Sequence, residues 1–587
     1  MTCVTLYGTG IPPATPRVLR AGALSAELED GALRAIRWHG IEILRGVNYL
    51  VRDPGWGTLP ASLSNLFIEE SDEAFAVSFE ATVGDGYQYD AEIQGSADGR
   101  LSFEVTGMAS ANLETCRTGF VVLHPIEGVA GEPVEVGHAD GGREETRFPR
   151  LISPAQPILS IESLTHRPVP GVTAVCRFEG DVFEMEDQRN WTDASYKTYV
   201  RPLSLPTPYT IQAGTRLTQA VRLEVTGQPT APAQVRDGIG VTVGPALDLV
   251  MPPVGAGIDP LCLPKRAEPG LGLLVGRLAG ARGDVETLRA YGDLARRAGA
   301  ELFLELPLAC DRPLDAELGE IAGRIDAAGV SVAGVTVAPA AYLKSYQPSG
   351  PWPEVPGFRE VYRAARKAFP GVAIGGGVHA FFTELNRARP PVDEVDYVSF
   401  TTSPIVHAAD ERSIWESLES LPFVMETARS FCGGKPIRVG PSAIGMRDNP
   451  YGVAPVENPD NRRVAMARRD PRQRGTFGAA WYLGYAAALA YEGAASVALG
   501  ALEGDFGFVG TPSQRVIVAL AEAKGAPLLK VEVSGGKSVA ALAWRTPAGP
   551  VLWLANGSPA AVRVDVVGHG AVEVPAGGVE GVALSTP

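Results

Sequence analysis

In the middle of the chain, short apolar runs alternate with segments whose apolar positions recur every three or four residues. The runs are typical of buried parallel strands, and the periodic segments of helices that cover them. Strands are predicted at residues 252–258, 271–278, 301–308, 332–339, 371–378, 395–402, 435–442 and 495–502. Helices are predicted at residues 284–299, 314–329, 357–369 and 413–431. Eight such strands predict a closed (β/α)8 TIM barrel over residues 240–525.

The segments on either side of this barrel have the pattern of antiparallel sheets. Residues 19–224 form short β-type runs separated by Gly, Asp and Pro, and similar runs return after residue 528. We therefore predict a multidomain α/β plus β protein, with an N-terminal β-sandwich (residues 1–230) and a small C-terminal β-sandwich (residues 526–587). The Pro- and Gly-rich residues 227–238 are the expected boundary. A doubly wound sheet is the alternative for the middle domain, but no GxGxxG motif follows its first strand.

Composition and charge narrow the classes of function. Among the 587 residues, 45% are hydrophobic and 20% are charged, which excludes a disordered chain. The net charge of −15 makes nucleic acid and anionic membrane surfaces unexpected partners. The six cysteines are widely spaced and form no CxxC pair, so reduced thiols are expected.

Two features of the sequence predict where the protein is located. The N-terminal sequence MTCVTLYGTGIPPATPRVLR lacks the basic start and apolar run of a signal peptide, so a cytoplasmic protein is expected. The most apolar long stretch, residues 477–502, contains Glu492 and several glycines. A buried helix followed by a buried strand explains this stretch better than a membrane span.

Polar side chains follow most of the predicted barrel strands, where the active sites of TIM barrels lie. The candidates, in strand order, are Arg277 (strand two), Glu305 (three), His379, Glu384, Asn386 and Arg387 (five), His407 and Asp410 (six), Ser442, Arg447 and Asn449 (seven), and Glu503 and Asp505 (eight). We expect these side chains to converge on one mouth of the barrel.

Several of these residues also have a structural interpretation. Glu305 lies in an apolar run and is expected either to act on substrate or to form a buried ion pair with Arg277 or Arg438. Glu384 also fits an ordinary helix start with Thr383 as its N-cap, and the two histidines fit hydrogen-bonded loop residues. The glycines at residues 375–377 do not match a P-loop, and we interpret them as making room for a ligand.

Metal and serine-nucleophile chemistry have little support in the sequence. His379, Glu384 and His407 contain the atoms for a metal site, but no HExxH helix or close histidine pair is present. Ser442 lies in GPSAIG, which is not a GxSxG nucleophile elbow. We therefore predict no metal and no other cofactor.

Two polar segments have more than one interpretation. The first contains six arginines, which are Arg462, Arg463, Arg468, Arg469, Arg472 and Arg474. A solvated loop is the favoured interpretation, and binding of an acidic or lactone substrate is the alternative. The second, residues 183–209, reads FEMEDQRNWTDASYKTYVRPLSLPTPY and includes Trp191 and Lys197. It fits an interdomain latch of salt bridges and a substrate contact equally well. Its NWT sequence matches an N-glycosylation site, which we discount because nothing in the sequence indicates secretion.

Several motifs resemble the bacterial D-apionate lactonase family. They are LYGTG, LHPIEGVAGEPVEVGHADG, FEMEDQRNWTDASYKTYVRPLSLP, FTELNRARPP, SPIVHAADERSIWESLES, MRDNP and RDPRQRGTFGAAW. The resemblance implies an N-terminal β domain, a TIM barrel, a small C-terminal β domain, and hydrolysis of D-apionolactone to D-apionate in apiose catabolism. The residues carried over with these motifs are Glu384, Asn386, Arg387, His407, Asp410, Arg447, Asn449, Arg472 and Gln473.

Lactone hydrolysis needs a base for water, groups that stabilise an oxyanion, and an acid for the departing ring oxygen. We predict Glu384 as base, His407 oriented by Asp410 as acid, and Arg447 with His379 at the oxyanion. Glu305, Glu503 and Asn386 are expected to hold hydroxyl groups. The full prediction is Glu384, His407, Asp410 and Glu305 as catalytic residues, and Arg277, His379, Asn386, Arg387, Arg447, Asn449, Glu503, Trp191 and Lys197 as substrate-binding residues.

Two other functions remain open from the sequence. A glycoside hydrolase would use two carboxylates among Glu305, Glu384 and Glu503, although strands four and seven lack the Asn-Glu and Glu ends of the largest barrel clan. A non-catalytic carbohydrate-binding scaffold is the third class. In each case the expected partner is a small carbohydrate or sugar lactone, and a homo-oligomer remains open.

Overall fold

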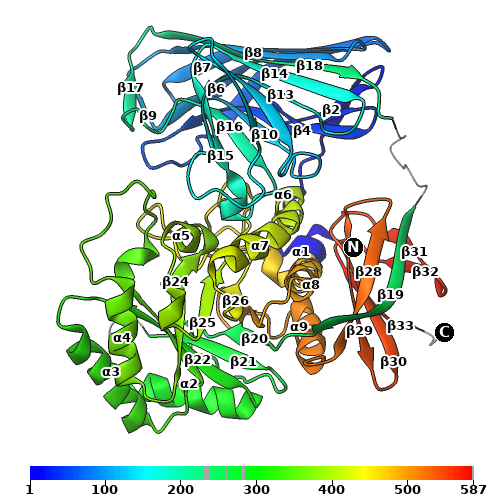
Figure 1. The fold of residues 1–587 in the computed structure, drawn as a ribbon. Helices are drawn as coiled ribbons and strands as arrows, with labels where there is room; N and C mark the ends of the chain where they lie inside the picture. Colours follow the sequence, from blue (N-terminus) through cyan, green and yellow to red (C-terminus); the bar gives the residue numbers. More distant parts are fainter. Residues whose placement is uncertain (231–237, 260, 279–283, 585–587) are drawn as a thin grey trace. The chain divides into compact units, whose positions relative to one another are not determined.

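A computed structural model describes residues 1–230, 238–259, 261–278 and 284–584 of the chain (Figure 1). Contacts within the chain divide it into two compact units. The barrel unit contains residues 1–13, 190–193 and 236–587, and the N-terminal unit contains residues 14–189 and 194–235. Residues 231–237 of the predicted boundary lie outside the described residues.

The centre of the barrel unit is a closed barrel of eight parallel strands, which confirms the predicted TIM barrel (Figure 1). The strands are β20 (Val254–Gly257), β21 (Leu273–Arg277), β22 (Glu301–Leu308), β23 (Gly334–Pro339), β24 (Ala373–Phe381), β25 (Tyr397–Thr401), β26 (Ile437–Ser442) and β27 (Ser496–Ala501). Most of their residues are buried. Because all eight strands run in the same direction, their carboxyl ends meet at one mouth.

Helices cover the barrel, and those predicted at residues 284–299, 314–329 and 357–369 are present. The helices are α2 (Val285–Ala298), α3 (Leu314–Ala328), α4 (Phe358–Ala368), α5 (Phe382–Arg387), α6 (Glu411–Glu416), α7 (Leu421–Phe431), α8 (Thr476–Tyr491) and α9 (Pro512–Glu522), with α1 (Cys3–Tyr7) at the N-terminus. Short 3-10 turns are η1 (Gln188–Trp191), η3 (Ala340–Leu343), η4 (Val392–Glu394), η5 (Ser417–Ser420) and η6 (Pro471–Arg474). The helix predicted at residues 413–431 is divided into α6, η5 and α7. Pro422 lies in the first turn of α7, where its missing N–H costs least.

The glycines at residues 375–377 make room for the barrel's own residues, which corrects the prediction that they make room for a ligand. A Cβ atom on Gly375 would lie 2.3 Å from the Tyr397 ring. A Cβ atom on Gly377 would lie 2.3 Å from the backbone oxygen of Ser399, and its φ of +117° is one that few other residues adopt. Close packing of β24 against β25 therefore explains these positions.

The C-terminal part of the barrel unit is a seven-stranded sheet in the order β32-β31-β19-β28-β29-β30-β33. Its strands are β19 (Ile239–Val250), β28 (Pro527–Ser534), β29 (Val539–Thr546), β30 (Gly549–Asn556), β31 (Val562–Val566), β32 (Gly570–Val574) and β33 (Val579–Ala583). Strand β19 comes from the range predicted for the barrel, but it pairs with β28 and β31. The chain therefore enters this sheet once before the barrel and again after it.

Helix α8 is almost completely buried, as predicted for residues 477–502. It contacts the C-terminal sheet, and the hydroxyl of Tyr491 donates a hydrogen bond to the backbone oxygen of Leu529. A helix that is apolar on all sides is stable only when it is covered on all sides. Within the described ranges, no helix is long and apolar enough to span a membrane.

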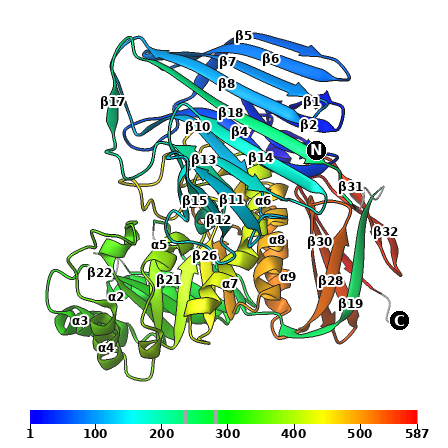
Figure 2. The ribbon, with the colours of Figure 1, turned by 45° about the horizontal axis from the view of Figure 1, so that its top comes forward.

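The N-terminal unit contains one 16-stranded antiparallel sheet (Figure 2). Its main order is β1-β2-β3-β4-β10-β16-β15-β13-β14-β18-β8-β7-β6-β5, with β11 and β12 attached to β13. The strands are β1 (Arg17–Ala21), β2 (Leu24–Glu29), β3 (Ala32–Trp38), β4 (Ile41–Arg52), β5 (Ala61–Glu70), β6 (Ala74–Val83), β7 (Tyr87–Ser96), β8 (Arg100–Ala109), β10 (Arg117–His124), β11 (Pro133–His138), β12 (Arg143–Arg147), β13 (Ile158–His166), β14 (Val172–Glu179), β15 (Phe183–Asp187), β16 (Tyr196–Val200) and β18 (Arg216–Gly227). A separate pair joins β9 (Leu113–Thr115) and β17 (Tyr209–Ile211).

The sequence predicts a β-sandwich here, and the strand order shows one continuous sheet. Hydrogen bonds connect the strands into a single sheet, whose opposite ends share one core. Leu19 in β1 and Phe75 in β6 belong to the same buried cluster, although their strands lie near opposite ends of the order. The local alternation of apolar and polar residues specifies which side chains are buried, but not which distant strands pair.

Candidate active site

A four-residue segment from the N-terminal half of the sequence, Asn190–Asp193, packs with the barrel unit. The backbone oxygen of Asn190 accepts a hydrogen bond from Thr383 Oγ1 at 2.8 Å. Its side-chain oxygen Oδ1 accepts another from Asn386 Nδ2 at 2.9 Å. Both partners lie at α5, directly after β24, so the segment brings Trp191 and Asp193 to the carboxyl ends of the strands.

The imidazole of His407 pairs with the carboxylate of Asp193. Its Nδ1 atom lies 2.7 Å from Asp193 Oδ2, and the ring of Trp191 meets the imidazole edge-on with 5.3 Å between centroids. We predicted that Asp410 orients His407, whereas the structure places Asp193 at Nδ1 of His407. Asp410 caps α6, because its Oδ1 accepts from the Ser413 backbone N–H and its Oδ2 from the Ser413 hydroxyl.

Glu384 is connected to Trp191 through the hydroxyl of Tyr451. The Tyr451 hydroxyl donates to Glu384 Oε1 at 3.1 Å and accepts a hydrogen bond from Trp191 Nε1. Glu384 Oε2 accepts from the Phe381 backbone N–H at 3.1 Å. Burial raises the pKa of Glu384, and the nearby Arg387 only partly opposes this rise. The carboxyl group therefore keeps its proton to a higher pH than an exposed glutamate.

Arg387 brings a positive charge to the same cluster. Its Nη1 atom donates to Ser345 Oγ at 2.8 Å, and its guanidinium carbon lies 5.2 Å from the centre of the Trp191 ring. The pKa values of Glu384 and Tyr451 both respond to this charge. Arg387 is thus placed to stabilise negative charge that develops beside Glu384.

Glu305 lies between two arginines. Arg277 Nε donates to its Oε2 at 2.7 Å, and Arg447 donates to both of its oxygens, at 3.1 and 2.8 Å. The register of β21 and β22 places Arg277 directly opposite Glu305. Burial alone would raise the pKa of Glu305, but the two arginines outweigh it and hold the pKa well below its usual range. The contacts fit the ion-pair interpretation and leave Glu305 ionised, so it is not a proton donor.

His379 also differs from its predicted role at the oxyanion. Its Nε2 atom lies 2.9 Å from the backbone oxygen of Thr336. Burial lowers the pKa of His379 to about 4, although Glu305 opposes this shift. The imidazole is therefore neutral near pH 7, with its N–H turned to a backbone acceptor. Arg447, the other predicted oxyanion residue, is already bound to both oxygens of Glu305.

Asn449 and Glu503 contact the backbone of the loops at the barrel mouth. The side chain of Asn449 accepts from the N–H groups of Tyr451 and Gly452, at 3.0 and 2.9 Å, and donates to the backbone oxygen of Ala454. Glu503 accepts from the N–H of Lys265 at 3.2 Å. Asn449 therefore holds the loop that carries Tyr451, which is a different task from the predicted substrate binding.

Lys197 belongs to the N-terminal unit, where it forms an ion pair with Glu186 on the neighbouring strand. Both residues are buried. This ion pair lies within the N-terminal unit, so it is neither a substrate contact nor a latch between domains. Trp191, from the same stretch of sequence, instead lies beside His407 and Tyr451 in the barrel unit.

The predicted solvated arginine cluster is mostly paired. Arg468 donates to Asp259 at 2.7 Å and to Asp505 at 2.9 Å, and so connects the loops after β20 and β27. Arg472 is completely buried against Asp470, and Arg463 donates to Glu411 at 2.5 Å. These arginines stabilise the loops, and the interpretation of an open, solvated loop was wrong for them.

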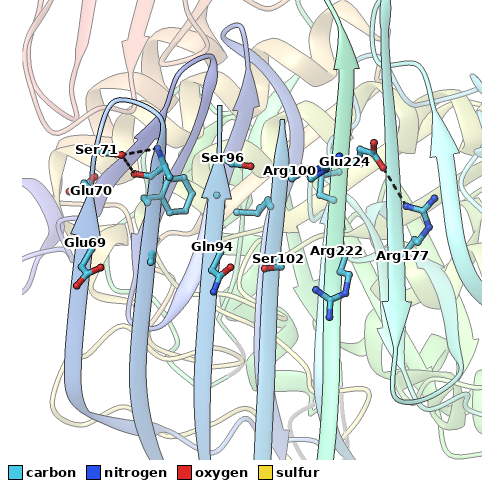
Figure 3. Close-up of a pocket in the computed structure, with 16 residues that line it drawn as sticks. Glu69, Glu70, Ser71, Gln94, Ser96, Arg100, Ser102, Arg177, Arg222 and Glu224 are labelled. Carbon is cyan, nitrogen blue, oxygen red and sulfur yellow. Dashed lines mark hydrogen bonds and ion pairs between the residues drawn. The ribbon is translucent and has the colours of Figure 1, made fainter. Parts of the chain in front are cut away.

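A cavity of about 690 Å³ lies on the N-terminal sheet (Figure 3). Gln94, Ser102, Arg222 and Arg177 lie opposite one another on β7, β8, β18 and β14 and form a row across it. The arginines already pair with glutamates, as in Arg177 with Glu224 at 3.7 Å. None of the predicted site residues is among the residues that line this cavity.

Sequence reasoning missed two residues of the barrel site. Asp193 lies in the polar segment at residues 183–209, but the positions of the strand ends do not connect it with His407. Tyr451 directly follows the MRDNP motif and is not among the predicted site residues. Within the part of the chain that the structure describes, no three His, Cys, Asp or Glu side chains come together as metal ligands.

Comparison with known proteins identifies the family. Family models match the D-apionate lactonase N-terminal domain at residues 4–228, its TIM barrel domain at residues 267–534, and its C-terminal immunoglobulin-like domain at residues 536–582. The chain belongs to the D-apionate lactonase family. The D-apionate lactonase of Brucella anthropi is 42% identical over 518 residues, which cover 86% of this chain and 85% of that protein. The predicted resemblance is confirmed, and so is the enzyme class, a hydrolase of the lactonase type.

Solved structures give weaker likenesses. A putative aldose 1-epimerase from Escherichia coli K12 has a TM-score of 0.25 at 11% identity, and covers 37% of this chain and 100% of its own. A Paenibacillus polymyxa xyloglucanase of glycoside hydrolase family 44 has a TM-score of 0.37 at 9% identity, covering 60% and 98%. The metagenomic glucanase-xylanase CelM2 has a TM-score of 0.38 at 10% identity, covering 60% and 97%. At these scores the likenesses support no conclusion on function.

Proposed function

We propose that this chain hydrolyses a sugar lactone of the D-apionolactone type to its hydroxy acid at the mouth of the barrel, in cytoplasmic apiose catabolism. The observation that supports this most is that Trp191 connects two groups that can transfer protons. Its ring contacts His407, which pairs with Asp193, and its Nε1 donates to Tyr451, which donates to Glu384. An imidazole–carboxylate pair and a buried carboxyl group supply the two proton-transfer groups that ester hydrolysis needs.

In the first step, His407 acts as the general base. Its Nδ1–H donates to Asp193, which leaves the lone pair of the neutral ring on Nε2. A water molecule attacks the carbonyl carbon of the lactone while one of its protons moves to Nε2. Asp193 stabilises the imidazolium that forms, as carboxylates do in other histidine pairs.

The attack places negative charge on the former carbonyl oxygen. Arg387 is the positive group that supports this charge, because it lies against Trp191 and close enough to Glu384 to affect its pKa. A charged donor that is fixed before the reaction needs no reorganisation in the transition state. His379 is not assigned to this role, because its ring is neutral and directed at Thr336.

In the second step, Glu384 acts as the general acid. The tetrahedral intermediate collapses, the bond from the carbonyl carbon to the ring oxygen breaks, and Glu384 gives its proton to that oxygen. The product is an open-chain hydroxy acid, and the proton held by His407 returns to Glu384 through solvent. Burial favours the protonated form of Glu384 before the reaction, which suits an acid better than the base that we predicted from the sequence.

The glycoside hydrolase alternative receives less support. It needs two carboxylates with different protonation among Glu305, Glu384 and Glu503. Glu305 is neutralised by Arg277 and Arg447, and Glu503 accepts from the backbone of Lys265. Burial raises the pKa of Glu384, and its carboxyl group is hydrogen-bonded to Tyr451 beside Trp191 and His407.

A pH-stat assay against a panel of aldonolactones and aryl glycosides tests the proposal, with a chelator control. We expect acid release from lactones and none from glycosides. Glu384→Gln is expected to lower kcat by about 10²- to 10⁴-fold with an unchanged circular dichroism spectrum. The exposed Glu457→Gln, on the loop after β26, is the matched control. Full activity of Glu384→Gln, or glycoside cleavage alone, would refute the proposal.

A further inference from the structure

The hydroxyl of Tyr451 lies between a donor that cannot accept and a carboxylate. An indole N–H is a donor only, so the oxygen of Tyr451 must accept the hydrogen bond from Trp191 Nε1. The single hydroxyl proton is then directed to Glu384 Oε1, at 3.1 Å. Trp191 and Glu384 are buried, and Tyr451 is partly buried. The direction of this chain of hydrogen bonds is therefore fixed by the chemistry of its first member.

The loop after β26 holds Tyr451 in this position from its backbone side. Asn449 Oδ1 accepts from the N–H groups of Tyr451 and Gly452. Lys344 Nζ donates to the backbone oxygen of Asn449 at 3.0 Å and to that of Gly452 at 2.5 Å. Two side chains thus fix the backbone on either side of Tyr451. A phenol that merely filled space would not need this support.

We propose that Tyr451 is a positioning residue that aims its one hydroxyl proton at Glu384, and that Trp191 of the Asn190–Asp193 segment fixes the direction of that proton. This inference rests on the proposed function, in which Glu384 is the general acid. It assigns Trp191 a second task besides contacting His407. The segment then acts on both proton-transfer groups, on His407 through Asp193 and on Glu384 through Trp191 and Tyr451.

The charged and polar groups around Glu384 determine the sign of the effect. Arg387, Ser345, the Phe381 N–H and the Tyr451 hydroxyl all favour its ionised form, whereas burial favours its protonated form. Burial and the charge of Glu384 raise the pKa of Tyr451, so that the phenol stays protonated and does not itself give up the proton. The Thr383 hydroxyl opposes part of this rise in the pKa of Tyr451. Removal of the Tyr451 hydroxyl therefore removes one donor from Glu384 and raises the pKa of that carboxyl further.

The pH profile of kcat/KM measures this effect. Tyr451→Phe is expected to move one limb of the profile to higher pH by about one unit, the size of one hydrogen bond to a charged group. If Glu384 is the acid, the limb that moves is the basic one. Trp191→Phe keeps an aromatic ring but releases the Tyr451 hydroxyl, so a smaller shift in the same direction is expected. The double variant is expected to match Tyr451→Phe alone.

Tyr491→Phe is the matched control, since it removes a partly buried phenol that bonds Leu529 in the C-terminal sheet. It is expected to cost a similar amount of stability and to leave both limbs in place. A Tyr451→Phe enzyme that folds, loses activity and keeps both limbs would overturn the proposal, because a purely structural role has that result. Movement of the acidic limb would retain Tyr451 as the positioning residue and reverse the role of Glu384.

A second readout does not depend on turnover. The carboxyl carbon of Glu384, followed by NMR in protein labelled with 13C at glutamate and assigned with Glu384→Gln, is expected to titrate at higher pH in Tyr451→Phe than in the wild type. If the wild type hydrolyses no lactone but this titration shifts, the proposed function fails and the hydrogen-bond arrangement stands. If hydrolysis is observed and the titration is unchanged, the inference about Tyr451 fails on its own.

Discussion

Asp193 precedes His407 by 214 residues, yet its Oδ2 atom lies 2.7 Å from the Nδ1 atom of that histidine. Asp193 is also held through its backbone oxygen, which accepts a hydrogen bond from Ser420 Oγ at 2.7 Å, beyond α6. The carboxylate is therefore held at both its side chain and its backbone. A residue from outside the barrel sequence completes the histidine pair at the barrel mouth.

Replacement of Asp193 by Asn tests this pair. An asparagine turns either an oxygen or an amide N–H toward Nδ1, and the amide N–H favours the tautomer with its proton on Nε2. We expect kcat to fall by about 10²- to 10⁴-fold, with a much smaller change in KM. Steady-state kinetics on the lactone that the panel identifies measures both constants. The exposed Asp181→Asn is the control, and a wild-type kcat in Asp193→Asn would exclude the pair from catalysis.

Asp410 is expected to behave in the opposite way. Since its side chain caps α6 through Ser413, Asp410→Ala is expected to lower the free energy of unfolding by about 1 kcal/mol. The kcat value is expected to stay within a few fold of the wild type. Urea denaturation and the lactone assay check the two parts. A loss of activity as large as that of Asp193→Asn would restore the sequence-based role of Asp410.

The barrel could be predicted from the sequence because its signals are local. Each strand is a short apolar run, and residues 301–308 and 435–442 match β22 and β26 closely. Strand-end reasoning then brought Glu384 and Arg387 into the site, because the direction of parallel strands decides where their ends lie. These features need no knowledge of distant contacts.

The other features depend on contacts between distant parts of the chain. The pairing of His407 with Asp193 could not be read from spacing, since 214 residues separate the two and Asp410 is nearer to His407 in sequence. The single 16-stranded sheet depends on pairs such as β4 with β10 and β14 with β18. The same limit applies to Gly375, whose missing side chain is required by the ring of Tyr397 on another strand.

Glu305 is expected to be essential for stability. It neutralises Arg277 and Arg447, both nearly buried, and Glu305→Gln removes this carboxylate from both of them while Arg277 keeps its ion pair with Asp448. Loss of one member of a buried ion pair costs about 3–5 kcal/mol. We expect a decrease of this size in the free energy of unfolding, measured with guanidinium chloride. The surface Glu320→Gln, which removes a partner of Arg312 and Arg324, is the control and is expected to leave the free energy of unfolding nearly unchanged. A stable, inactive Glu305→Gln would instead indicate a direct role in the reaction.

Two buried histidines are expected to make the N-terminal unit sensitive to acid. His124 on β10 and His166 on β13 lie with 6.2 Å between their ring centres. Within the described residues, both ring nitrogens of His166 and Nδ1 of His124 lack a hydrogen-bond partner. Burial lowers the pKa of His124 to about 3, helped by the charge of His166, and burial lowers the pKa of His166 to about 4. Both rings are therefore neutral in the folded state near pH 7.

The sign of the pH dependence follows from the two states. Below about pH 6.5 the unfolded chain binds a proton at each histidine that the folded chain does not bind, so stability falls as the pH falls. The decrease continues until the pH reaches the folded values, about 4 for His166 and about 3 for His124. At pH 5 each histidine is expected to have cost about 2 kcal/mol relative to pH 7.

Replacement of His166 by Phe is expected to remove its share of this loss. The ring of His166 already packs against Phe148 at 5.9 Å, so an aromatic ring without ionisable atoms suits the site. Hydrogen-exchange mass spectrometry on β10 and β13 at pH 7 and pH 5 measures the local free energy of opening. We expect the difference between the two pH values to shrink by about 2 kcal/mol in His166→Phe. The exposed His39→Gln is expected to leave the difference unchanged, and an unchanged difference in His166→Phe would show that the ring is already charged or hydrated in the folded protein.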